Sequence, residues 1–283
     1  MKKIILSILA IVLVAMIALA IYLLPTFRNM FSYEKIDHDL QLTIMTGYGG
    51  NSILLTSNDG DSALIVDTKM AGGSKKVRKL VEQLAPDAVL TIVNTHFHFD
   101  HSAGNSRFPK ATIVAGAYSE EDWKEASGME RAPDLMLEEG DTLIMRYGDE
   151  VVQVRNMGRG HTWNDVVVYL ENRNMLITGD LLFNGWHPPL LGDDGASVSG
   201  WTSILNRLID DYDPDVVVPG HGPLCNESAL VTLRDYFVSA ESAIGNDMLR
   251  EELEDRYSGW FRIPMTSSLD KTMAFITKEH ATQ

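Results

Sequence analysis

A buried β-strand that leads into a cluster of metal-ligating side chains is the feature that most restricts this sequence. The apolar, β-branched run Val89–Asn94 predicts the strand, and His96, His98, Asp100 and His101 follow it directly. In an extended or tightly turning segment, alternate side chains point the same way, so His96 and His98 can bind one ion. Asp100 and His101 lie past the strand end and can turn toward a second ion. The pattern therefore predicts a site for two metal ions.

Three more candidate ligands come later in the chain, each close to a short apolar run. His161 lies in a glycine-flanked loop, Asp180 follows a short strand that ends at Gly179, and His221 lies in the segment Pro219–Gly222. Several strands of one sheet can end at a common edge, and loops carried there can shape a pocket. We therefore expect these side chains to join the first cluster.

These motifs and their order resemble the metallo-β-lactamase superfamily. The resemblance runs from about Leu40 to Pro223 and includes Asp67 at the end of a strand over 63–67. It implies an α/β fold, a four-layer α/β/β/α sandwich with the metals at one edge of its two sheets. It also implies a ligand set: His96, His98 and His161 for the first metal, Asp100, His101 and His221 for the second, and Asp180 between the two.

A site of this composition is expected to activate water. Imidazoles and carboxylates suit zinc, and also iron or manganese, so we predict two zinc ions with iron or manganese as alternatives. Two ions roughly 3.5–4 Å apart share a water, lower its pKa and polarise a carbonyl or phosphoryl oxygen. Asp100 and Asp180 are the candidate catalytic residues because their charges stabilise the ions and orient the water. Asp67 is predicted to accept a hydrogen bond from a ligand imidazole or a backbone amide, with a simple turn role as the alternative.

Departures from individual branches of the superfamily narrow the function. Zinc β-lactamases of the cysteine type have Cys where this chain has Asp180, and its single cysteine is Cys225. The arrangement is more similar to glyoxalase II and related thioester hydrolases. We therefore predict a binuclear hydrolase that attacks a small ester, thioester or lactam with a metal-bound hydroxide. The alternatives are a mononuclear-iron oxidoreductase of the sulfur dioxygenase type, a zinc β-lactamase proper, and a metal-binding protein without activity.

The net charge of −15 restricts the partners. Coulomb repulsion opposes binding of nucleic acids and other polyanions, so a small-molecule substrate is expected. The sequence leaves the oligomeric state open.

The segment 181–201 is predicted to form an irregular substrate-binding loop, because it is rich in aromatic residues, proline and glycine and has no helical period. His187 is placed to donate to a substrate oxygen. The alternative is that the aromatic residues plug the edge of the sandwich and that His187 is merely solvated. The candidate pocket residues are Phe183, Trp186, His187 and Trp201, with Trp163 as a weaker one.

The amino terminus predicts a membrane anchor. Ile4–Leu24 is almost entirely apolar, and as a helix it would be about 31 Å long, enough to span a bilayer core. Lys2 and Lys3 precede it, so the positive-inside rule places the catalytic domain outside the cytoplasm. A signal peptide cleaved after Ala18–Ala20, giving a secreted or periplasmic protein, is the alternative. The predicted division is an anchor over 1–25, a tether over 26–38 and a metallo-β-lactamase-like domain over 39–283.

The remaining elements are read from periodicity and turn residues. Strands are predicted over 41–46, 52–56 and 111–117 and in a hairpin of 141–146 with 150–155, and helices over 74–84, 118–126, 203–211 and 227–256.

Overall fold

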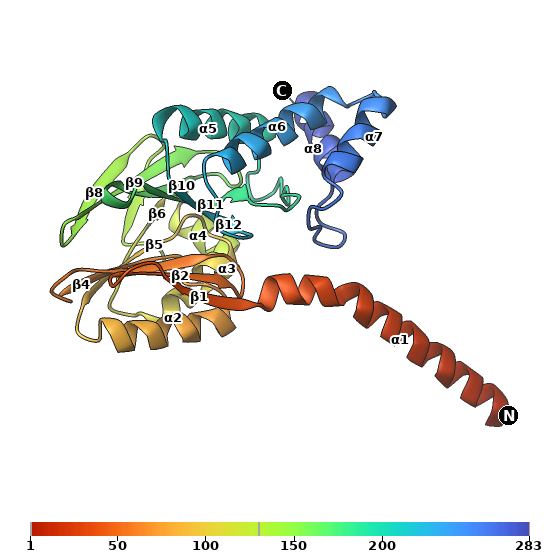
Figure 1. The fold of residues 1–283 in the computed structure, drawn as a ribbon, viewed down its shortest axis with the longest axis horizontal. Helices are drawn as coiled ribbons and strands as arrows, with labels where there is room; N and C mark the ends of the chain where they lie inside the picture. The colour runs from red at the N-terminus through yellow and green to blue at the C-terminus, as the bar shows by residue number, and fades with distance from the viewer. Residues whose placement is uncertain (1, 130, 283) are drawn as a thin grey trace.

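The computed structural model describes residues 2–129 and 131–282, which form two β-sheets packed face to face with helices outside them (Figure 1). The first sheet runs in the order β1 (Tyr33–Asp37), β2 (Leu42–Gly47), β3 (Ser52–Thr56), β4 (Ser62–Val66), β5 (Val89–Val93), β6 (Thr112–Gly116), β7 (Leu135–Leu137). The second runs in the order β12 (Val216–His221), β11 (Met175–Phe183), β10 (Asp165–Leu170), β9 (Glu150–Gly158), β8 (Thr142–Tyr147). The helices are α1 (Lys2–Phe31), α2 (Ala71–Leu84), α3 (Phe99–Ser102), α4 (Glu120–Ser127), α5 (Val198–Asp211), α6 (Ser228–Ser242), α7 (Asp247–Arg256) and α8 (Leu269–Thr282), with short 3-10 helices at Ala103–Arg107 and Glu171–Arg173.

Three hydrophobic layers hold the sandwich together. Apolar side chains of both sheets, such as Leu64 and Val168, meet in the central layer. Helix α2 covers the outer face of the first sheet through residues such as Val77. Helices α5 and α6 cover the second sheet through residues such as Ile204 and Leu233. The predicted α/β/β/α sandwich is thus confirmed, and each layer follows from the burial of one apolar face.

Parallel pairing brings the ends of key strands to one edge. β4 and β5 are parallel and in register, so Val66 pairs with Val93 and the segments after them leave the sheet side by side. β11 and β12 are also parallel, and Phe183 pairs with His221 at their far ends. The candidate metal ligands that follow or end these strands come to this edge because the carboxyl ends of parallel strands meet there.

Three predicted elements differ from the structure. The single helix expected over 227–256 is two helices, because the chain turns at Gly245 with a φ of +78° and Asn246 caps α7 by accepting from the amide of Leu249. β11 continues through Asp180 to Phe183, so this aspartate lies within a strand and not after it. The irregular segment is shorter than predicted, because α5 begins at Val198 with Ser197 as its cap.

Helix α1 extends away from the two sheets and exposes apolar side chains such as those of Leu13 and Ile21 (Figure 1). None of the helices in the described part of the chain has both the length and the apolar character needed to cross a membrane. The predicted transmembrane helix is therefore not supported. Residue 1 and the side chains of residues 2–8, 10, 22, 25, 26, 29 and 30 lie outside the described set. Residues 26–38, predicted as a tether, contain the end of α1 and the strand β1. The division into domains stays a prediction.

Candidate metal centre

The structure brings all seven candidate ligands to one edge of the sandwich, in two adjoining groups. Each group combines side chains from separate elements, which restricts their relative movement. His96 and His98 come from the turn after β5, Asp100 and His101 from α3, His161 from the loop between β9 and β10, Asp180 from β11, and His221 from the end of β12.

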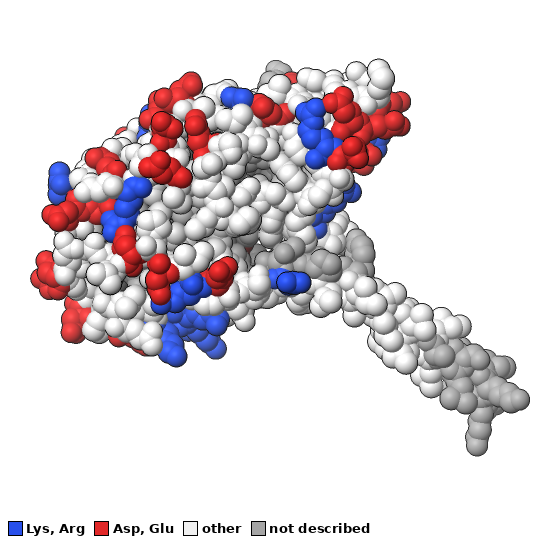
Figure 2. Space-filling view, in the orientation of Figure 1, with Lys and Arg blue, Asp and Glu red and all other residues white. Residues whose placement is uncertain are grey.

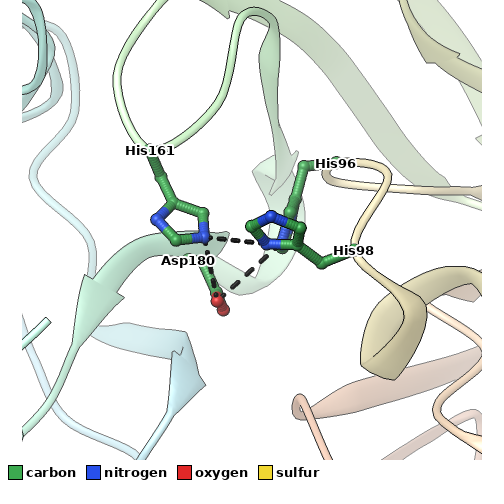
Figure 3. Close-up of side chains that lie close together, drawn as sticks. All are labelled: His96, His98, His161 and Asp180. Carbon is green, nitrogen blue, oxygen red and sulfur yellow. Dashed lines mark hydrogen bonds and ion pairs between the residues drawn. The ribbon is translucent and has the colours of Figure 1, made fainter. Parts of the chain in front are cut away.

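The first cluster consists of His96, His98, His161 and Asp180 (Figure 3). The Nδ1 atom of His98 lies 3.0 Å from Nε2 of His96 and 3.1 Å from Nε2 of His161. Asp180 Oδ2 lies 3.4 Å from Nε2 of His161 and 3.8 Å from Nε2 of His96. Three imidazole nitrogens and one carboxylate oxygen therefore converge on one point.

The second cluster consists of Asp100, His101 and His221. Asp100 Oδ2 lies 3.3 Å from Nε2 of His221 and 3.8 Å from Nε2 of His101. The other oxygen of Asp180, Oδ1, lies 3.0 Å from Nε2 of His101 and 3.5 Å from Nε2 of His221. Asp180 thus presents one oxygen to each cluster, which is the placement expected of a ligand that bridges two ions.

The buried atoms at the centre fit a cation. His101 Nε2 and Asp180 Oδ1 are shielded from solvent, and among the described residues neither has a directed hydrogen-bond partner. Buried polar atoms without partners are costly, and a metal ion between the clusters would satisfy both. Imidazole nitrogen and carboxylate oxygen are donors that zinc, iron and manganese accept. The two clusters could therefore hold divalent metal ions.

Asp67 orients a histidine of the second cluster. Its Oδ2 accepts from Nδ1 of His101 and from the hydroxyl of Thr95, both at 2.7 Å, and its Oδ1 accepts from the amide of Thr95 at 2.9 Å. Because Nδ1 of His101 then carries the proton, Nε2 is left free to face the cluster. This is the hydrogen bond to a ligand imidazole that the sequence predicts for Asp67.

Two further carboxylates support the first cluster and are missed by the sequence analysis. Asp165 accepts from the amides of His161 and Thr162 at 2.7 Å and 3.0 Å and from the Thr162 hydroxyl at 2.7 Å, which fixes the loop that carries His161. Burial raises the pKa of the Asp165 carboxyl to about 6. Asp194 lies 3.1 Å from Nε2 of His98 and leaves Nδ1 of that ring for the cluster. An aspartate four residues after a loop histidine could have indicated Asp165, whereas no local signal points to Asp194.

Glycines allow the backbone to approach the ligands. A Cβ atom at Gly220 would lie 2.0 Å from Asp180 Oδ1, and one at Gly50 would lie 2.1 Å from Cε1 of His101. Both separations are far below van der Waals contact, so any larger residue would displace the ligand side chains.

Burial and nearby carboxylates pull the pKa values of the ligand imidazoles in opposite directions. Burial lowers the pKa of His96 well below its usual value and that of His161 to about 3. At the second cluster burial acts the same way, but the charge of Asp180 and its neighbours outweighs it. The pKa of His101 is therefore raised well above its usual value, and that of His221 is raised to about 9. A metal ion at the second cluster would take the place of these protons.

The predicted pocket residues divide into three that are packed in the core and two that line cavities. Phe183 stacks on His221 with ring centroids 5.1 Å apart, and Trp201 lies 5.1 Å from the ring of His161 and donates its indole N–H to a backbone carbonyl. His187 is also buried, with Nδ1 2.9 Å from the hydroxyl of Tyr236. The burial of Phe183, His187 and Trp201 favours the alternative to a substrate pocket, and a role for them in substrate binding stays a prediction. Phe183 and Trp201 pack against ligand rings from the core side, as the alternative held for the aromatic residues. His187 is not solvated, because it packs against Tyr236 and Trp260.

Trp163 and Trp186 line two cavities that flank the centre. A cavity of about 640 Å³ beside the first cluster is lined by residues that include Trp163 and Asp194. A cavity of about 450 Å³ beside the second cluster is lined by residues that include Trp186 and His221. The cavity beside the second cluster therefore reaches a ligand, His221, whereas the other adjoins the first cluster only through Asp194, which contacts His98.

A first prediction follows from the burial of Trp201. Trp201→Ala is expected to lower the free energy of unfolding by about 3–5 kcal/mol, because it removes a fully buried aromatic side chain and leaves a cavity behind His161. Trp163→Ala is the control: its side chain is 46% exposed, and we expect a loss of about 1 kcal/mol or less. Denaturant unfolding of both variants measures this, and equal losses would contradict the assignment of Trp201 to the core.

Comparisons with known proteins agree with this geometry. A family model described as "Metallo-beta-lactamase superfamily" matches residues 45–221. The chain is 25% identical over 189 residues to a metallo-beta-lactamase type 2 of Bacillus sp. (strain 170), covering 65% of this chain and 71% of the relative. It is 26% identical over 182 residues to an acyl-coenzyme A thioesterase of Bos taurus, covering 53% and 62%. Among solved structures, a metallo-beta-lactamase from Pontibacter korlensis matches with a TM-score of 0.62 at 22% identity, covering 72% of this chain and 98% of that one, a likeness in fold alone.

Proposed function

The chain belongs to the metallo-beta-lactamase superfamily, and on that premise we propose that it is a hydrolase that uses two divalent metal ions, zinc foremost, to cleave a small ester, thioester or lactam. The first cluster would hold one ion and the second cluster the other. When bound, the ions would lower the pKa of a shared water and polarise the carbonyl oxygen of the substrate.

The position of Asp180 carries the proposal. Its two oxygens face different clusters, at 3.4 Å from His161 Nε2 and 3.0 Å from His101 Nε2. One carboxylate shared in this way would keep two ions close together, as binuclear hydrolysis requires. The charges of His101 and His221, acting against burial, hold the pKa of Asp180 well below its usual range, so the side chain is an anion.

Asp100 is the second carboxylate that we propose to act on the reaction. Its Oδ2 faces His101 and His221, and its side chain is 17% exposed, whereas that of Asp180 is 5% exposed. Asp100 would therefore accept a hydrogen bond from the attacking water and orient the lone pair of the water oxygen toward the carbonyl carbon. No serine or cysteine nucleophile is needed for this chemistry.

The proposed substrate class rests on a reaction that lactams, esters and thioesters share, which is attack of water at an acyl carbon. Relatives named as a beta-lactamase and as an acyl-coenzyme A thioesterase both fall in this class. Cysteine-type lactamases have a cysteine where this chain has Asp180. This difference favours esters and thioesters over lactams as substrates. Figure 2 shows separate patches of acidic side chains, one of them over α7, and basic ones gathered over α2. The net charge of −15 favours a small substrate over a nucleic acid.

A substrate panel on the full chain tests the proposal. The zinc-loaded protein is assayed with acyl thioesters, aryl esters and a chromogenic cephalosporin, and then again after removal and return of the metal. We expect hydrolysis of at least one acyl class that disappears with the metal and returns with it. Hydrolysis that survives metal removal would contradict the proposal. Oxygen consumption by an iron-loaded form without hydrolysis would favour the oxidoreductase alternative.

We also propose that the catalytic domain lies outside the cytoplasm. The support is the sequence pattern of Lys2 and Lys3 before a long apolar run, together with the exposed apolar side chains of α1. Cell fractionation and protease accessibility of intact cells test the location, and N-terminal sequencing identifies a cleaved signal peptide. Protection of the domain inside intact spheroplasts would contradict it.

A further inference from the structure

Lys69 is a fully buried lysine outside both clusters. It lies on the loop between β4 and α2, two residues after Asp67, and its backbone has a φ of +64°. Its ammonium donates to the carbonyl of Gly47 at 2.7 Å and to that of Gly50 at 2.5 Å. A polar nitrogen buried in this way is costly unless it is well paired, and both of its partners belong to one turn, residues 47–51, which starts at the last residue of β2 and leads into β3.

The turn contacts two members of the second cluster through Gly50. The amide of Gly50 donates to the backbone carbonyl of Asp100 at 3.2 Å. The same glycine lies against His101, so closely that a Cβ atom would be 2.1 Å from its ring. A shift of the turn would therefore move Asp100 and His101 together.

The turn reaches the third member of the second cluster through Asn51. The amide of Asn51 donates to the carbonyl of Gly220 at 2.7 Å, and its side chain donates to the carbonyl of Gly222 at 2.9 Å. These two glycines flank His221. Within the described part of the chain, the turn forms no hydrogen bond with the three histidines of the first cluster.

We propose that Lys69 is a positioning residue for the second metal ion: its ammonium clamps the turn 47–51 against the backbone that carries Asp100, His101 and His221. This inference rests on the proposed function. It assigns Lys69 an effect on one cluster only, although both clusters share Asp180. The ammonium itself would repel a nearby cation, so the clamp and the charge act on metal binding with opposite signs.

Lys69→Met tests the clamp because it keeps an unbranched side chain, one atom shorter than that of lysine, and removes the three donors. The variant is made in the full chain in two backgrounds, His161→Ala, which disables the first cluster, and His221→Ala, which disables the second. Zinc affinity is measured in each against a competing chelator. We expect Lys69→Met to weaken binding by about 10–100-fold in the His161→Ala background and by less than about twofold in the His221→Ala background.

Other outcomes overturn the inference. Tighter zinc binding by Lys69→Met would show that the charge acts and the clamp does not, and equal weakening in both backgrounds would show a general structural role. Lys79→Met, on the exposed face of α2, is the matched control and should change neither affinity. Lys69→Gln, which keeps an amide donor, provides the test if the methionine variant does not fold and should give an intermediate loss of zinc affinity.

Two zinc ions in the wild type with unchanged affinities in the Lys69 variants would contradict this inference alone. A wild type that binds no metal would overturn the proposed function as well.

Discussion

Asp180→Ala is expected to lower kcat/KM by about a thousandfold or more, at least the usual cost of one preorganised electrostatic group. Among the described residues, Asp180 is the one that presents an oxygen to both clusters, so its removal acts on both ions. It would also leave His101 Nε2 without the nearer of its two carboxylate neighbours, since Asp100 Oδ2 lies farther away at 3.8 Å. Steady-state kinetics at saturating zinc measure the loss, and circular dichroism checks that the fold is retained.

Two variants define what the loss at Asp180 means. Asp180→Asn keeps the shape of the side chain and removes its charge, so it should recover little activity if the anion is what matters. Asp210→Ala removes an exposed carboxylate from α5 and should leave kcat/KM unchanged. Asp180→Ala with most of its activity at saturating zinc would show that the carboxylate does not act on both ions.

His161→Ala is expected to remove the metal ion of the first cluster and to lower kcat/KM by about a hundred- to a thousandfold. His161 is fully buried, and its Nε2 lies 3.1 Å from Nδ1 of His98, so no water-exposed group can easily replace it. We expect the zinc content to fall from two ions per chain toward one. Metal analysis after dialysis measures this, alongside the kinetics.

His280→Ala is the matched control for His161→Ala, because it removes an exposed histidine from the carboxyl-terminal helix α8. It should keep both ions and full activity. Retention of two ions by His161→Ala would contradict the assignment of His161 to the first cluster.

The ligand candidates could be predicted from the sequence because each carries a local signal. His96, His98, Asp100 and His101 follow directly on a strand, and the structure brings all four to the same edge of the sandwich. The layer order could be predicted only through the resemblance to the superfamily, since alternation of strands and helices indicates no more than a mixed α/β fold.

Two supporting residues, Asp194 and Lys69, could not be predicted because their partners are distant in the sequence. Asp194 reaches His98 across 96 positions, and Lys69 acts on a turn about twenty positions before it. Burial of Trp201 likewise depends on α5 packing over β11, which no local pattern around the tryptophan encodes. The hydrogen bond of its indole to Leu181 then completes a wall behind the centre.

Helix boundaries failed where a cap competed with periodicity. The charged run over 227–256 has helical spacing throughout, but the side chain of Asn246 accepts from the amide of Leu249 and begins a new helix. Ser197 acts in the same way at the start of α5, where Glu279 of α8 also accepts from the Ser197 hydroxyl and the Val198 amide. The second contact joins residues far apart in the chain and could not be predicted from local sequence.

The number and identity of the metal ions in the purified full chain test the central claim most directly. Elemental analysis of protein prepared without added metal, and again after loading with zinc and dialysis, is expected to give two divalent ions per chain, since seven ligand groups exceed what one tetrahedral ion can use. A single ion per chain, predominantly iron and unchanged by zinc loading, would contradict the binuclear site.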